Sequence, residues 1–125
     1  MDLLRTALSL LVLDLRSTGG LTLQLLDEPA LDDPAYDSLW LLSGDDCRTG
    51  LLAFRDLPAA EQVVQVAEQV QDFVHEELCR LGLPVTWPEC PDHPASHPLT
   101  PALSGGHPSW QCPKSAQPVA AIGEL

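Results

Sequence analysis

Residues 58–82, "PAAEQVVQVAEQVQDFVHEELCRLG", decide how the rest of the chain can be arranged. Pro58 suits the first turn of a helix, Asp56 is placed to cap that turn, and Gly82 follows the expected end. The sequence therefore predicts one long helix over residues 58–81. A helix of this length needs a large surface to pack against, and the flanking segments have to supply it.

The two sides of this long helix differ in polarity. Apolar residues recur at helical spacing along one side, namely Val63, Val66, Ala67, Val70, Val74, Leu78 and Leu81. Polar residues cover the other side, namely Glu61, Gln65, Glu68, Gln69, Asp72 and Glu76. Val64, Phe73 and Cys79 widen the apolar face, which fits either a deep core or a partner helix. We expect the apolar side to pack across a sheet.

The segments before the long helix predict that sheet. Residues 2–16 are apolar at most positions and predict a mostly buried helix. Residues 21–28, 36–44 and 48–57 alternate in polarity and predict three strands separated by turn-forming residues. The expected fold class is α+β, an α-β-β-β-α layer in which the long helix packs on one antiparallel sheet.

The chain changes character after Leu83, because more than half of its twelve prolines lie between residues 84 and 108. Residues 84–87 predict a short strand, and residues 98–113 predict a β-hairpin that turns at a Ser-Gly-Gly sequence. Residues 117–125 are apolar enough to add a last edge strand.

Two segments are therefore expected in this chain. Residues 1–83 predict an acidic α+β core, and residues 84–125 predict a proline-rich hairpin with a terminal strand. At 125 residues the chain has the length of one domain, so we expect both segments to pack as one structural unit.

Residues 89–115, "ECPDHPASHPLTPALSGGHPSWQCPKS", gather cysteine and histidine at both ends of the predicted hairpin. Two residues separate Cys90 from His93, and Ser115 stands in the matching position after Cys112. Over residues 87–115 this pattern resembles a zinc ribbon, in which two knuckles at one end of a hairpin hold a tetrahedral ion. The resemblance implies a structural zinc site.

Serine is a poor zinc ligand, so a fourth donor has to come from elsewhere. His97 leaves the first knuckle, whereas His107 lies beside the hairpin turn, at the far end. The expected ligand set is Cys90, His93, His97 and Cys112. Three interpretations stay open, a structural zinc ion, a degenerate ribbon that keeps the hairpin without metal, and loop residues unrelated to a ribbon. A catalytic zinc would need an open fourth position, and no glutamate is clearly placed as its general base.

The chain is strongly acidic, with a net charge of -12 and a pI near 4.3. Such a field repels phosphate backbones and anionic membranes, which argues against nucleic acid and membrane partners. Two predicted loops concentrate carboxylates that either keep the loops solvated or dock a basic protein partner. These carboxylates belong to Asp27, Glu28, Asp32, Asp33, Asp37, Asp45 and Asp46.

Other residues carry no clear chemistry. Cys47 and Cys79 are expected to be free cysteines and His75 a solvated or capping residue. The apolar run at residues 7–13 is too short to cross a bilayer and has no basic leader. We therefore expect a cytoplasmic protein whose cysteines are reduced or metal-bound.

These features together predict a non-enzymatic protein-binding protein, with a partner that is basic or has an exposed apolar face. The order of elements resembles that of small acidic secretion-type chaperones and of several bacterial immunity proteins. Dimerisation through the long helix is compatible with this hypothesis. Two alternatives come from other classes, a small zinc metalloenzyme and a nucleic-acid-binding zinc-ribbon protein.

Overall fold

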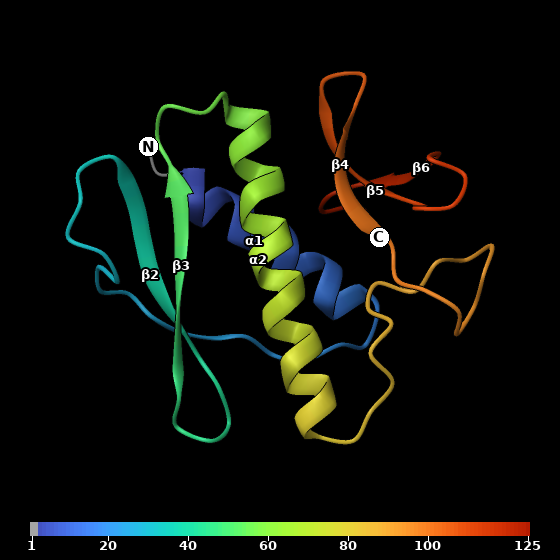
Figure 1. The fold of residues 1–125 in the computed structure, drawn as a ribbon, viewed down its shortest axis with the longest axis horizontal. Coiled ribbons are helices and arrows are strands. Elements are labelled where there is room, and N and C mark those ends of the chain that lie inside the picture. The colour runs from blue at the N-terminus through green and yellow to red at the C-terminus, as the bar shows by residue number, and fades with distance from the viewer. Residues whose placement is uncertain (1–2) are drawn as a thin grey trace.

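The computed structural model describes residues 3–125 as two helices and two antiparallel sheets of three strands each (Figure 1). The elements are α1 (Leu3–Ser17), β1 (Gln24–Leu26), β2 (Tyr36–Leu42), β3 (Arg48–Phe54), α2 (Ala59–Arg80), β4 (Thr100–Ser104), β5 (His107–Gln111) and β6 (Pro118–Ala121). Helix α2 lies between the sheets, and α1 crosses behind it in the view of Figure 1. The predicted α+β class is confirmed.

The first sheet has the order β1-β2-β3. Strands β2 and β3 pair over their full length, from Tyr36 opposite Phe54 to Leu42 opposite Arg48. The buried residues of its inward face are Leu39, Leu41, Leu51 and Ala53. Strand β1 is shorter than the predicted strand at residues 21–28.

Helix α2 follows the predicted boundaries closely. The expected capping role of Asp56 is wrong, because Pro58 occupies the N-cap position and no side chain caps the helix. Gly82 ends the helix as expected, with a positive φ of 71° that favours glycine. Leu81 was expected in the buried stripe but is 49% exposed, because it lies beyond the last helical turn.

The polar side of α2 has an unexpected role at the edge of the first sheet. The Gln69 side chain accepts a hydrogen bond from the Leu52 N–H at 3.0 Å and donates one to the Leu52 carbonyl at 2.7 Å. Gln65 accepts another from the Phe54 N–H at 2.9 Å. These glutamines satisfy backbone groups that an edge strand leaves unpaired, so they protect the outer edge of β3.

The second sheet has the order β4-β5-β6 and contains the predicted hairpin and terminal edge strand. The hairpin turns at Gly105 and Gly106, which both have positive φ. The strand predicted at residues 84–87 is absent. Prolines at positions 84 and 88 lack the N–H that a strand needs, so this segment runs beside α2 without strand pairing.

Both segments of the chain contribute to one hydrophobic cluster. The indole rings of Trp87 and Trp110 meet edge to face, with centroids 5.5 Å apart. Fully buried Asp14 links α1 to this region. Its carboxylate accepts hydrogen bonds from Trp110 Nε1 at 2.7 Å, from the Gly123 N–H at 2.7 Å and from the Leu125 N–H at 3.0 Å. Among residues 3–125, neither helix is long and apolar enough to traverse a lipid bilayer.

Candidate metal centre

The first knuckle lies in the loop between α2 and β4. Backbone hydrogen bonds from His93 N to the Cys90 carbonyl and from Ser96 N to the His93 carbonyl form two successive tight turns. An isolated β-bridge between Glu89 and Pro98 closes the base of this loop. The chain therefore leaves and re-enters the core at adjacent points, which positions Cys90 and His93 together.

Helix α2 holds this loop through the buried side chain of Gln71. Its amide donates hydrogen bonds to the carbonyls of Trp87 at 3.2 Å and Leu99 at 2.6 Å, on the two arms of the loop. The ring of His75 also contacts the Trp87 carbonyl, at 2.6 Å. A carbonyl only accepts, so Nε2 of His75 carries the proton. His75 is thus a structural donor, and its predicted solvated or capping role is not what the structure shows.

The structure brings together the predicted ligand set. One donor atom from each of Cys90, His93, His97 and Cys112 lies within 4.8 Å of every other. Nδ1 of His93 is 3.6 Å from the sulfur of Cys90 and 3.6 Å from that of Cys112. Tetrahedral zinc, with Zn–S of about 2.3 Å and Zn–N of about 2.0 Å, places sulfur and nitrogen about 3.5 Å apart. This separation suits a shared ion.

His97 supplies the clearest sign that a ligand belongs here. Its Nδ1 lies 3.1 Å from the Pro98 carbonyl, which only accepts, so Nδ1 carries the proton and donates. Nε2 of the neutral ring is then a free acceptor, and it is buried with no hydrogen-bond partner among the described residues. Metal-bound histidines characteristically donate their other ring N–H in this way.

The second knuckle follows β5 and is built around the sulfur of Cys112. Hydrogen bonds from the side chain and backbone N–H of Ser115, together with that of Lys114, lower the pKa of the Cys112 thiol to about 6. Such bonds favour the thiolate, which is the form that binds metal. Ser115, which stands where a ribbon has its second ligand, therefore stabilises the thiolate of Cys112.

The other candidates lie outside this cluster. His107 is exposed at the hairpin turn, as expected from its position in the sequence. Cys47 and Cys79 are exposed and free. Within residues 3–125, the cluster that could hold a metal ion is thus confined to the two knuckles and the loop that leaves the first.

The acidic residues divide into two groups at opposite ends of β2. One group lies before β2 or, in the case of Asp37, at its start, and the other follows Leu42. Several already have partners within the chain. Asp27 pairs with Arg5, and Asp37 pairs with Arg55 at 2.7 Å.

Two further carboxylates belong to loop hydrogen bonds. Asp33 accepts a hydrogen bond from the Ala35 N–H at 2.9 Å. Asp45 accepts bonds from the Ser43 hydroxyl and the Cys47 N–H, and the first of these chiefly lowers the pKa of Asp45. No such contact is recorded for Glu28, Asp32 or Asp46 within residues 3–125.

Sequence reasoning missed two features of the site region. Gln71 was not singled out, although it lies within the apolar arc of α2, close to Val70 and Val74, where a polar residue needs a buried partner. An apolar groove beside α1 was also missed, because that helix was expected to be mostly buried. Leu13 is 52% exposed on it.

No protein-family model, curated protein or solved structure matches this chain. The function is therefore argued from the geometry of the molecule itself.

Proposed function

We propose that Cys90, His93, His97 and Cys112 bind one zinc ion in a structural site. The donor set of two sulfurs and two imidazoles is the one that tetrahedral zinc prefers. The two knuckles and the intervening glycine turn keep the resemblance to a zinc ribbon. Four protein donors close the coordination sphere, so water has no open position on the ion and the site suits structure over catalysis.

The experiment for this site is elemental analysis of freshly purified protein. We expect about one zinc per chain in the parent protein and none in Cys90→Ser. Cys79→Ser is the matched control, since Cys79 is exposed and outside the cluster, and it should keep the zinc. A parent protein that contains no metal and gains no stability from added zinc would identify a degenerate ribbon instead.

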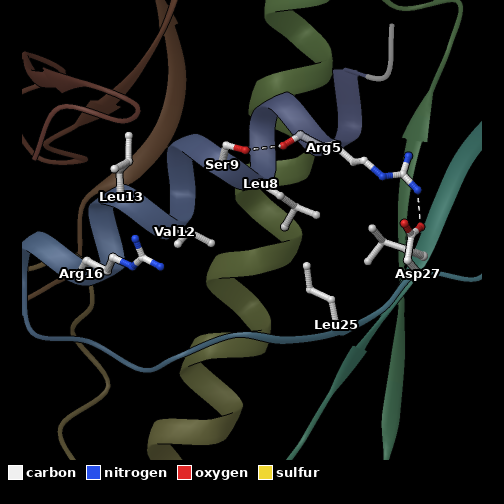
Figure 2. Close-up of a pocket in the computed structure, with 9 residues that line it drawn as sticks. Arg5, Leu8, Ser9, Val12, Leu13, Arg16, Leu25 and Asp27 are labelled. Carbon is white, nitrogen blue, oxygen red and sulfur yellow. Dashed lines mark hydrogen bonds and ion pairs between the residues drawn. The ribbon is translucent and has the colours of Figure 1, made fainter.

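We propose further that the protein is a non-catalytic module that binds another protein. The observation that carries this proposal is an open groove of about 540 Å³ beside α1, which Leu8, Val12, Leu13, Leu25 and Leu39 line with apolar surface (Figure 2). Exposed apolar surface of this kind marks interaction sites on folded proteins. Of the partners expected from the sequence, the groove favours one with an exposed apolar face.

The acidic loops remain a second part of this proposed surface. Asp27, Asp33, Asp37 and Asp45 form contacts within the chain, which support a role in ordering the loops. Glu28, Asp32 and Asp46 are the carboxylates that we assign to contact with a basic partner.

Photo-crosslinking in the native host tests the binding function. A photoreactive residue at Leu13 is expected to capture one recurrent protein, and Leu25→Glu in the same chain should abolish that crosslink. The same residue at Leu103, which is 41% exposed on the second sheet, serves as the control. A Leu13 crosslink pattern identical to that from Leu103 would contradict the proposal.

A further inference from the structure

We infer that the groove beside α1 takes an amphipathic helix of another protein, one with carboxylate side chains flanking its apolar face. This inference rests on the proposed binding function and names the partner class of that surface. It follows from the shape of the groove, from the charges on its rim and from the composition of α1.

The shape of the groove suits a helix. Figure 2 shows Leu8 and Val12 on the side of α1 that faces Leu25, with Arg5 and Arg16 at opposite ends of the helix. The α1 segment between the two arginines is about 16 Å long at 1.5 Å per residue, which is three turns of a helix lying alongside it. Leu25 is 43% exposed on the far wall.

The layered fold explains why this space is open. Helix α1 packs against α2, and α2 packs along β3, at one edge of the first sheet. Strand β1 forms the other edge, and the groove lies between it and α1. A third helix placed there would extend the helical layer, and helices pack at 8–10 Å from one another in such layers.

The charges on the rim select the partner. Among residues 3–125, the charged residues that line the groove are Arg5, Asp27 and Arg16. Asp27 is paired with Arg5, whereas exposed Arg16 has no ion-pair partner among residues 3–125. The described part of the rim is therefore net positive in a chain of net charge -12. A carboxylate on the incoming helix complements Arg16, and a basic residue there would be repelled.

The described residues of α1, Leu3–Ser17, do not supply that carboxylate in a second copy of this chain. Asp14 lies on the buried side of α1. The exposed positions of α1 along the groove are Arg5, Ser9, Leu13 and Arg16. If α1 of one copy docked beside α1 of another, the arginine side chains of the two helices would face each other. The composition of the helix thus points to a different protein.

Two designed peptides of about 16 residues test the inference. Both carry leucine at helical spacing along one face, and they differ only in flanking glutamate or lysine. Fluorescence anisotropy with the full chain should show the glutamate peptide binding at least about tenfold more tightly than the lysine peptide, with the ratio falling as salt screens the charges. Leu13→Glu should abolish binding of the glutamate peptide.

Charge reversal on the rim provides the decisive variant. Arg16→Glu should weaken binding of the glutamate peptide and strengthen binding of the lysine peptide, while Arg48→Glu, the same change at an exposed position of β3 outside the groove, should leave both unchanged. Circular dichroism of each variant confirms that it is folded.

Three outcomes would overturn the inference, namely equal affinity for the two peptides, tighter binding of the lysine peptide, and no binding of either. Self-association in sedimentation that Leu13→Glu removes would identify a second copy as the occupant and would also overturn the inference. In each of the first three cases, a Leu13 crosslink to another protein would still support the proposed function. Failure of this inference is therefore distinguishable from failure of the proposed function.

Discussion

Asp14 joins three parts of the molecule that are far apart in the sequence. Its two carboxylate oxygens accept hydrogen bonds from the Trp110 indole and from the backbone N–H groups of Gly123 and Leu125. The Trp110 indole is buried together with the carboxylate, and Gly123 and Leu125 are half-buried beside it. This single side chain therefore couples α1 to the second sheet and to the chain's last residues.

Replacement of Asp14 by alanine should be strongly destabilising. The change leaves buried N–H donors without an acceptor, and we expect a loss of about 3 kcal/mol in the free energy of unfolding. Urea denaturation measures this loss. Asp72→Asn, at an exposed position on α2, should change it by less than about 0.5 kcal/mol. Equal effects of the two changes would contradict this account.

Glu77 anchors the end of α2 to the β2–β3 turn. Its carboxylate accepts hydrogen bonds from Arg80 at 2.8 Å and from the Gly44 N–H at 3.3 Å. The bond from Arg80 chiefly lowers the pKa of Glu77 below its ordinary value of 4.5. Because the folded-state pKa is the lower one, this carboxylate contributes stability above pH 4.5 and loses it as the pH falls through the folded-state value.

Glu77→Gln should therefore be less stable than the parent at pH 7, by no more than about 1 kcal/mol. The difference should shrink as the pH falls through the folded-state pKa of Glu77, because the carboxylate is then protonated and both chains are uncharged at this position. Denaturation curves at several pH values provide the measurement, and Glu76→Gln, at the exposed neighbouring position, is the control. A difference that stays constant with pH would show that Glu77 acts without its charge.

At the scale of elements, the outer edge of β3 depends on a helix. Gln69 pairs with both backbone groups of Leu52 and so occupies the place of a neighbouring strand. Because the polar spacing of α2 suggested solvent-facing side chains, the sequence did not reveal that the helix lies along an edge strand. Helix propensity and polar periodicity describe a single element, whereas this contact joins a helix to a strand.

Loss of the Gln69 side chain should open that edge. In Gln69→Ala we expect faster hydrogen exchange of the Leu52 amide, a stability loss of about 1 kcal/mol and more aggregation on heating. NMR exchange rates and light scattering measure these effects. Glu68→Ala, one residue away at an exposed position, should match the parent in all of them, and Leu52 exchange unchanged in Gln69→Ala would refute the protective role.

At the scale of the whole molecule, the candidate metal centre connects the loop that follows α2 to the second sheet. Trp87 and Trp110 lie just before Cys90 and Cys112 in the sequence and are buried in the shared core. Removal of the proposed zinc ion should therefore loosen the packing around both indoles, while the first sheet, which supplies no ligand, should keep its structure.

Chelation should shift tryptophan fluorescence to longer wavelength in a Trp40→Phe background, where only Trp87 and Trp110 report. The free energy of unfolding should fall by about 4 kcal/mol relative to protein with free zinc at a thousandfold excess over Kd. Cys90→Ser should show no further response to chelator. An unchanged spectrum and stability in the parent would argue against a zinc ion that supports the fold.

The sequence by itself determined the element types, because the alternation in β2 and β3, the apolar stripe of α2 and the glycine hairpin turn are local patterns. It also predicted the cluster of Cys90, His93, His97 and Cys112, since knuckle spacing and the direction of a hairpin are local too. The short segment at residues 84–87 was misjudged because proline removes the donors that pairing requires.

Only the tertiary structure decided what crosses between elements. The three bonds to Asp14, the glutamine contacts along β3 and the groove between α1 and β1 each join residues that no local pattern relates. They depend on how the helices lie on the sheets, and that arrangement minimises exposed apolar surface and unpaired polar groups over the whole chain at once.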